Sequence, residues 1–372
     1  MEKSGLVDHA APAEVAAKSP RKLEWVDSVR GWAVLGVIGV HAVQGFPELW
    51  RPLYNLLHAG MYGVQLFFVV SAFTMLHSWN SRGQESRREL KFFIRRFFRI
   101  APMFYVGIPL YTAFFYVTAK TLPTWSDVGL TLAFLHGFSY TAINKVVAGG
   151  WSIGVEFAFY VLIPWLGRVV RNVRDATIAL GIGLTLVAVN FFGLRAVDAK
   201  PAEFTDYSFF YYWLPNQFFV FGLGFVMYWW WKRSGFEELS PKLGWACLLL
   251  GLGGLVAVGV VRPNNILSHV PFSILFLPFV VGMASRRPKL LVNRLVGAIG
   301  VNSFSIYIWQ YALIGGLVRV WRKLDLNAPD LVAFGLIFGV ATAMSYILAE
   351  VSRMWIEDPG QAWGRKVIAR LQ

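Results

Sequence analysis

Apolar residues occur along this chain in long stretches that alternate with short polar segments. Each stretch has roughly 16 to 24 residues, which is enough for a helix to cross a hydrocarbon core of about 30 Å. The pattern predicts an all-α fold, a polytopic transmembrane helical bundle with about ten membrane-spanning helices. The spans are expected at residues 29–46, 60–78, 101–118, 151–167, 175–193, 208–231, 243–261, 268–284, 296–318 and 331–349.

A shorter apolar run at residues 128–138 does not fit this pattern. It has about 11 residues and contains His136, a length more typical of an interfacial or re-entrant segment than of a span. We expect such a segment here, with an eleventh span as the alternative.

Composition agrees with a membrane protein and limits its partners. The chain has 372 residues, of which 56% are hydrophobic and 15% are charged, whereas soluble domains are about 25% charged. The formal net charge of +14 would suit a protein that binds nucleic acid, but the basic residues are distributed as in a membrane protein. If ten helices alternate from a cytoplasmic N-terminus, 26 of the 35 Lys and Arg lie on the cytoplasmic side. This positive-inside bias predicts cytoplasmic termini and argues against a nucleic-acid partner.

The two ends of the chain are predicted to be tails. Residues 1–22 contain acidic residues and prolines and lack an apolar core, so we expect a disordered cytoplasmic tail there, not a signal peptide. Residues 23–359 form the predicted transmembrane domain, and residues 360–372 a cytoplasmic C-terminal tail without an appended domain. The single cysteine excludes an intrachain disulfide, and no CxxC or HExxH pattern predicts a metal site.

Two ionisable residues, Arg30 and His41, lie in the first apolar stretch. Eleven helical residues advance by three turns plus about 20°, so both side chains share one helix face, about 16 Å apart along the axis. Ionisable groups in a membrane are costly and usually face the protein interior or a water-filled path. We therefore predict a reaction or translocation site here.

A cluster of arginines, Arg95, Arg96 and Arg99, precedes the third predicted span. Spacings of three and four residues put these side chains on one broad helix face. Guanidinium groups bind phosphate oxygens with two parallel hydrogen bonds. On spacing alone, anchoring to lipid headgroups is the stronger interpretation.

Glu156 is an intramembrane carboxylate in the fourth predicted span. Counting from the membrane surface where each helix starts places Glu156 and His41 at similar depth, in the outer half of the bilayer. A carboxylate beside an imidazole suits a general base and its orienting partner. Pairing of Glu156 with an arginine as structural support is the alternative.

Several polar residues lie on other predicted spans. Ser71 is in the middle of the second span, and Ser303, Tyr307 and Gln310 are on the ninth. For Ser71 taken alone, a structural role is the stronger interpretation. The polar residues of the ninth span are typical of a cavity lining, but hydrogen bonds between helices explain them nearly as well.

In their order along the chain, these motifs resemble those of the acyltransferase 3 family of integral-membrane acyltransferases, which O-acetylate bacterial surface polysaccharides and related acceptors. The resemblance covers about residues 23–359 and rests on VDSVRGWAVLGVIGVH, GVQLFFVVSAF, RRFFRIAP, WSIGVEFAFY, SFSIYIWQ and IEDP. The chain departs from the family where Ala72 replaces the usual Gly, Phe304 the usual Tyr, and Gln310 a frequent His. Gln310 is therefore expected to form hydrogen bonds, not to transfer protons.

The resemblance implies acyl transfer at the bacterial inner membrane. The expected donor is cytoplasmic acetyl-CoA, a co-substrate with no permanently bound cofactor, and the expected acceptor is a hydroxyl of a carbohydrate or glycolipid on the outer side. A succinyl or longer donor remains open. The expected partners are membrane lipids and this acceptor. The alternative is that the acyl group passes first to a separate polysaccharide biosynthesis protein.

The predicted site residues follow from this interpretation. His41 is the expected general base, supported by Glu156, with an acyl-histidine intermediate as the alternative. The expected donor-binding residues are Arg30, Arg95, Arg96 and Arg99. The expected supports for the substrate or oxyanion are Ser71, Trp151, Ser152, Ser303, Tyr307 and Gln310. The competing class is a transporter or flippase in which Arg30, His41 and Glu156 relay protons or bind an anion.

Overall fold

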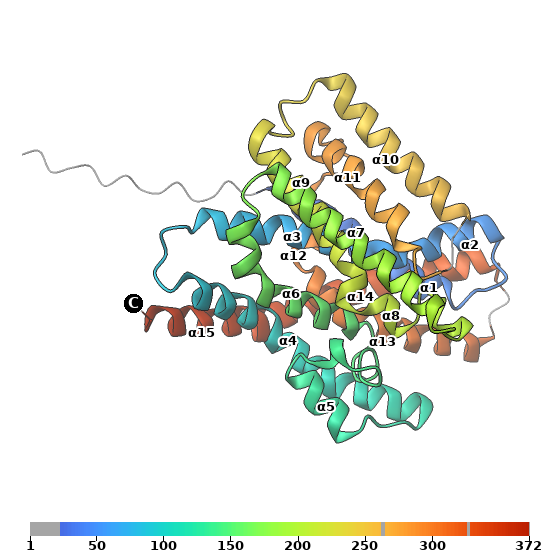
Figure 1. Cartoon of the computed structure of the whole chain (residues 1–372). Coiled ribbons are helices and arrows are strands. Elements are labelled where there is room, and N and C mark those ends of the chain that lie inside the picture. Colours follow the sequence, from blue (N-terminus) through green and yellow to red (C-terminus); the bar gives the residue numbers. More distant parts are fainter. Residues whose placement is uncertain (1–22, 262–264, 326–327, 372) are drawn as a thin grey trace, which may run out of the picture.

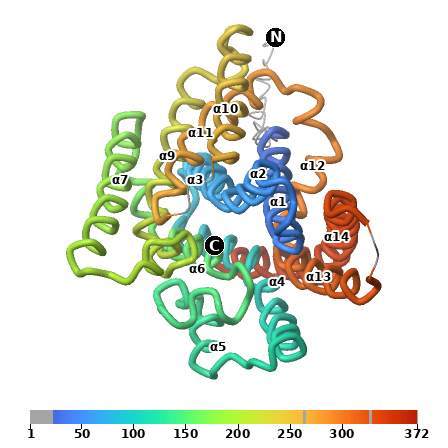
Figure 2. The backbone as a smooth tube through the Cα atoms, turned by 90° about the vertical axis from the view of Figure 1, so that its right-hand side faces the viewer, coloured from blue at the N-terminus to red at the C-terminus, as the bar shows by residue number. Residues whose placement is uncertain are grey.

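The computed structural model describes residues 23–261, 265–325 and 328–371. Within these ranges every regular element is a helix, which confirms the all-α prediction. Figure 1 shows the helices gathered into one bundle, and Figure 2 shows the same backbone turned by 90°. The long helices are α1 (Glu24–Val43), α3 (Gly63–Ser81), α4 (Arg88–Ala119), α6 (Gly150–Val169), α7 (Val173–Ala196), α9 (Leu214–Ser234), α10 (Pro241–Val261), α11 (His269–Arg286), α13 (Ser303–Leu324) and α14 (Asp330–Ser352).

Shorter elements connect these helices. They are α2 (Arg51–His58), α5 (Trp125–Leu132), α8 (Phe209–Tyr212), α12 (Arg294–Val301) and α15 (Asp358–Ala369), with 3₁₀ turns at Ala59–Tyr62, His136–Phe138 and Pro201–Phe204 and a π-helical turn at Arg353–Glu357. The apolar run at 128–138 is thus divided between α5 and a 3₁₀ turn. Since α5 has only eight residues, this segment is too short to span a membrane.

The described part of the chain contains eight helical segments long and apolar enough to cross a membrane. The helices α9 and α13 have 21 and 22 residues, so they have the length but are less apolar. Each of the ten predicted spans nevertheless overlaps one long helix, although the spans at 208–231 and 296–318 also include the short helices α8 and α12. The count of ten spans and the cytoplasmic termini stay predictions.

Several helix boundaries differ from the predicted spans. Helix α1 begins at Glu24, before residue 29, and α4 begins at Arg88, before residue 101. Residues 358–369, partly within the predicted C-terminal tail, form α15, which packs against α4. The predicted tail at residues 1–22 lies outside the described residues.

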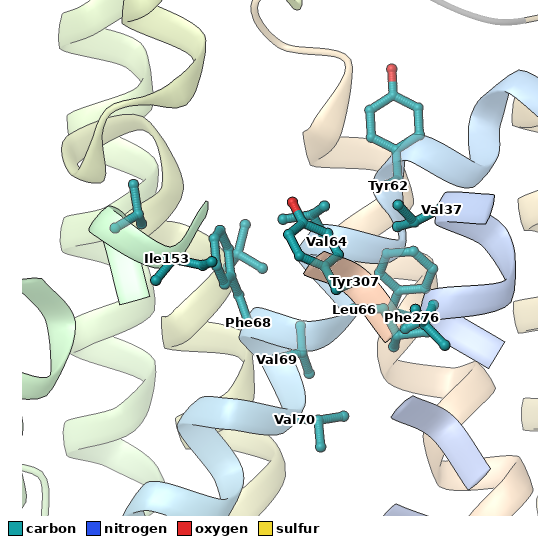
Figure 3. Packing of buried hydrophobic residues seen from close by; sticks show 14 of the residues in the cluster. Val37, Tyr62, Val64, Leu66, Phe68, Val69, Val70, Ile153, Phe276 and Tyr307 are labelled. Carbon is teal, nitrogen blue, oxygen red and sulfur yellow. The ribbon is translucent and has the colours of Figure 1, made fainter. Parts of the chain in front are cut away.

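Helix α1 is packed on several sides by other helices. It contacts α3, α12, α13 and α14. In Figure 3, Val37 of α1, Val64 and Phe68 of α3, Ile153 of α6 and Tyr307 of α13 belong to one buried cluster. The helices that carry the predicted site residues therefore meet around the centre of the bundle.

Close approach of α12 to α1 depends on Gly300. A Cβ atom at this position would fall on the backbone carbonyl oxygen of Asp27 in α1. We expect Gly300→Ala to push the helices apart and to lower the free energy of unfolding by about 1–3 kcal/mol, the usual cost of overpacking. Thermal unfolding of the purified protein in detergent measures this change.

Gly297 supplies the matched control on the same helix. A Cβ atom there has Ser28 Oγ as its nearest neighbour, at 3.9 Å, so alanine fits and reduces the backbone entropy of the unfolded chain. Gly297→Ala is expected to keep or slightly raise the unfolding temperature. Equal unfolding temperatures for the two variants would show that α12 does not lie this close to α1.

Candidate active site

A cavity of about 320 Å³ lies between α1, α3, α4, α6 and α13. We call it the arginine cavity. Its volume is at the lower end of the range for small-molecule sites. Its charged and polar lining residues are Asp27, Arg30, Ser71, Thr74, Arg96, Arg99, Ser152, Glu156, Tyr160, Ser303 and Tyr307. Eight predicted site residues from different helices thus lie around one space.

The charges around the arginine cavity are predominantly positive. Three guanidinium groups face the carboxylates of Asp27 and Glu156, and Arg30 interacts electrostatically with both. The Arg96 guanidinium lies 5.7 Å from the centre of the Tyr160 ring, a cation–π distance. Arg99 is exposed. The excess positive charge and the exposed arginine suit an anionic ligand such as a phosphate.

Glu156 is held in place within the arginine cavity. Its Oε1 atom accepts hydrogen bonds from the hydroxyls of Ser71 and Tyr160, the latter at 2.8 Å. Tyr160 follows Glu156 by one helical turn, so both side chains lie on the same face of α6. This carboxylate therefore acts as a fixed counter-charge to the arginines.

A second cavity, of about 260 Å³, contains His41. We call it the histidine cavity. The Nδ1 atom of His41 lies 2.8 Å from Oε1 of Gln310, and the edge of Tyr311 contacts the imidazole ring at a centroid distance of 4.9 Å. Because an amide oxygen can only accept a hydrogen bond, this arrangement places the proton on Nδ1. The lone pair of Nε2 is then available to take a proton from a substrate.

The two cavities meet at Val64 and Tyr307, which line both. Figure 3 shows these side chains beside each other. The Tyr307 hydroxyl donates to the carbonyl oxygen of Gly149 at 2.9 Å and lies 3.0 Å from Ser152 Oγ. The Tyr307 side chain therefore lies at the boundary between the arginine cavity and the cavity of His41.

Gly149 has a special role beside Tyr307. Its φ angle is 74°, in the left-handed region that favours glycine, and a Cβ atom there would lie 2.5 Å from the Tyr307 hydroxyl. Trp151 and Ser152 follow on α6, and they line the histidine and arginine cavities respectively. The start of α6 thus forms part of the boundary between the two cavities.

The structure places Glu156 and His41, which were expected to pair, apart from each other. Because α1 begins at Glu24, His41 lies in its last turn, whereas Glu156 lies nearly two turns into α6. The two side chains consequently line different cavities. Gln310 takes the place beside the imidazole, and Glu156 faces arginines, as in the alternative interpretation.

Arg95 lies apart from the other arginines that were expected to bind the donor. Its guanidinium forms two hydrogen bonds to Glu85, at 2.8 and 2.7 Å, and it does not line the arginine cavity. Consecutive helical residues point about 100° apart, so Arg96 faces the cavity while Arg95 faces the α3–α4 connection. The hydrogen bond from Arg95 holds the pKa of the Glu85 carboxyl below its usual value.

Other site residues were not singled out from the sequence. Tyr160, which contacts Glu156, has the one-turn spacing that would have indicated the contact. Glu357, in the π-helical turn, accepts a hydrogen bond from Ser305 and interacts electrostatically with Arg99 and Arg30. Glu357 belongs to the IEDP motif, but only the fold brings it near the arginines.

Comparison with known proteins supplies relatives of the chain. A family profile described as "Acyltransferase domain" matches residues 23–350. Peptidoglycan O-acetyltransferase OatA of Listeria monocytogenes is 23% identical over 90% of this chain and 55% of its own length. Exopolysaccharide production protein ExoZ of Rhizobium meliloti is 26% identical over 77% of this chain and 87% of its own. Acyltransferase MdmB of Streptomyces mycarofaciens is 27% identical over 55% of this chain and 57% of its own length.

No solved structure matches the chain. The chain spans 55% of the length of the Listeria relative and 57% of that of the Streptomyces relative. The profile match nevertheless covers most of the chain and contains every residue that lines the two cavities. The chain therefore belongs to the acyltransferase 3 family.

Proposed function

We propose that this protein transfers an acyl group, most simply acetyl, from cytoplasmic acyl-CoA to a hydroxyl group on the outer side of the bacterial inner membrane. One observation carries the proposal. A cavity with three arginines and a cavity with a histidine meet inside the bundle at Val64 and Tyr307. The first suits a phosphate-bearing donor, and the second suits general-base chemistry.

The donor would bind with its phosphates on Arg30, Arg96 and Arg99. Its pantetheine arm is long and thin, as a narrow passage along α1 would require. Arg30 and His41 are separated by about 16 Å along the helix axis. The thioester would reach the histidine cavity past Tyr307, while Glu156 keeps the arginines and Ser71 in place.

The chemical step follows from the tautomer of His41. The Nε2 atom takes the proton of the acceptor hydroxyl, and the hydroxyl oxygen attacks the thioester carbonyl. The tetrahedral intermediate collapses with cleavage of the carbon–sulfur bond, and the imidazolium returns its proton to the leaving CoA sulfur. The hydrogen bond to Gln310 fixes the ring orientation throughout. In a two-step alternative the same nitrogen attacks the thioester first and carries the acyl group.

Two relatives support a carbohydrate or glycolipid acceptor. One is named a peptidoglycan O-acetyltransferase and another an exopolysaccharide production protein. Both kinds of polymer present hydroxyl groups. The positive-inside distribution of Lys and Arg supports an orientation with the arginine cavity toward the cytoplasm.

Incubation of the purified protein in detergent with radiolabelled acetyl-CoA and extracted cell glycans tests the proposal. The expected products are free CoA thiol and alkali-labile acetyl ester on the glycan, in equal amounts. A transporter or flippase would leave the thioester intact, and that result would refute acyl transfer. The His41→Ala protein serves as the inactive control.

A further inference from the structure

A third cavity, of about 620 Å³, opens beside the histidine cavity. We call it the tyrosine groove. It is formed by the connection between α5 and α6 and by the residues that precede α9. We propose that this groove binds an uncharged saccharide chain and presents one of its hydroxyl groups to His41. The inference rests on the proposed function and adds the place and the chemical class of the acceptor.

The tyrosine groove is continuous with the histidine cavity. Asn144, Tyr207 and Tyr212 line both spaces. A chain seated in the groove therefore has a direct way toward the imidazole. The arginine cavity shares none of these three residues, so donor and acceptor would approach His41 from different sides.

Aromatic rings line the groove next to polar groups. The rings of Tyr140 and Phe209 lie 5.5 Å apart between centroids, and Tyr140 and Tyr207 are 61% and 49% exposed. The C–H face of a sugar ring packs on such aromatic surfaces, while its hydroxyl edge needs hydrogen-bonding partners. An aromatic belt at the membrane interface also exposes rings, but these rings face a hollow with polar walls.

The charges of the groove favour a neutral ligand. Lys145, the cationic lining residue in the described part of the chain, forms an ion pair with Asp127 at 2.9 Å. This interaction holds the pKa of the Asp127 carboxyl below its usual value. Glu203, also in the lining, accepts a hydrogen bond from Tyr140 at 2.7 Å. An anionic chain would therefore find no excess positive charge here, in contrast to the arginine cavity.

Ring-removing variants test this assignment. Tyr140→Ala and Phe209→Ala are produced in cells that lack the native protein, and alkali-labile acetate on total extracted glycans is measured. Each variant is expected to lower this acetate about tenfold, the effect of removing one aromatic anchor from a binding site. Radiolabelled acetyl-CoA should bind to the purified variants as tightly as to the unmodified protein, because the arginine cavity is unchanged.

Two control variants separate binding from general disturbance. Trp125→Ala removes a ring that is 91% exposed on α5 and lines none of these cavities, so glycan acetate should stay at the unmodified level. Tyr140→Phe keeps the ring and loses the hydrogen bond to Glu203, and it should retain most of the acetate. After anion-exchange separation, the acetate is expected on neutral glycans.

The possible outcomes are distinct. Full acetate in both ring-removing variants would overturn the groove assignment, as would an equal loss in Trp125→Ala. Acetate found on anionic glycans alone would overturn the choice of a neutral ligand. If the unmodified protein adds no acetate compared with cells that lack it, the proposed function itself fails.

Discussion

Replacement of His41 by alanine is expected to lower acetyl transfer by about 10²- to 10⁴-fold, the usual contribution of a general base. The side chain is next to the amide oxygen of Gln310, which orients the ring through Nδ1. Alanine removes Nε2, the proton acceptor of the proposed reaction, and leaves a space that water can fill. Formation of acetyl ester from radiolabelled acetyl-CoA measures the loss.

Binding of CoA provides the internal control for this variant. His41 and the arginines line different cavities, so CoA affinity should stay unchanged in His41→Ala. An unchanged rate of acetyl transfer would remove His41 from the mechanism. A parallel loss of CoA binding would mean that the histidine supports the fold of the donor site instead.

Simultaneous replacement of Arg96 and Arg99 by glutamine is expected to weaken CoA binding by about a hundredfold or more, since hydrogen bonds to charged groups contribute about 1.5–3 kcal/mol each. Both guanidinium groups line the arginine cavity, and Arg99 is exposed. Glutamine keeps much of the side-chain length but loses the charge and the planar fork. Equilibrium binding of radiolabelled CoA to the purified protein gives the affinity.

Arg95→Gln is the matched control for the arginine pair. It neutralises an adjacent arginine that is bound to Glu85 outside the cavity. This variant should bind CoA normally and show at most a small loss of stability, because a partly exposed ion pair contributes about 0–1 kcal/mol. Equal weakening by Arg95→Gln would indicate that general positive charge, not the cavity, holds the donor.

The pattern of apolar residues was sufficient to predict the long helices, but not short ones such as α12 and α15. Each long helix coincides with a predicted span because helices of this length need continuous apolar faces in lipid. Intramembrane charge likewise pointed to Arg30 and Glu156, which the fold brings around one cavity. The physical reason is the same for each of these charged residues, because a charge within the bundle requires polar neighbours.

Helix boundaries and contacts between residues far apart in the sequence could not be predicted from the sequence pattern. Helix α1 starts earlier than predicted and His41 lies in its last turn, whereas Glu156 lies nearly two turns into α6. The ion pair between Arg95 and Glu85 depends on how the α3–α4 connection folds back. The tyrosine groove joins two connections that are far apart in the sequence, and no helical periodicity marks its residues.

The central claim is that the acyl group moves through the protein from the arginine cavity to His41. Sealed inverted membrane vesicles, which expose their cytoplasmic face, test it most directly when radiolabelled acetyl-CoA is added outside and extracted glycan is enclosed inside. The account predicts labelled acetyl ester on the enclosed glycan, with no CoA entering the vesicles. Acetylation that requires glycan and acetyl-CoA on the same side of the membrane would contradict it.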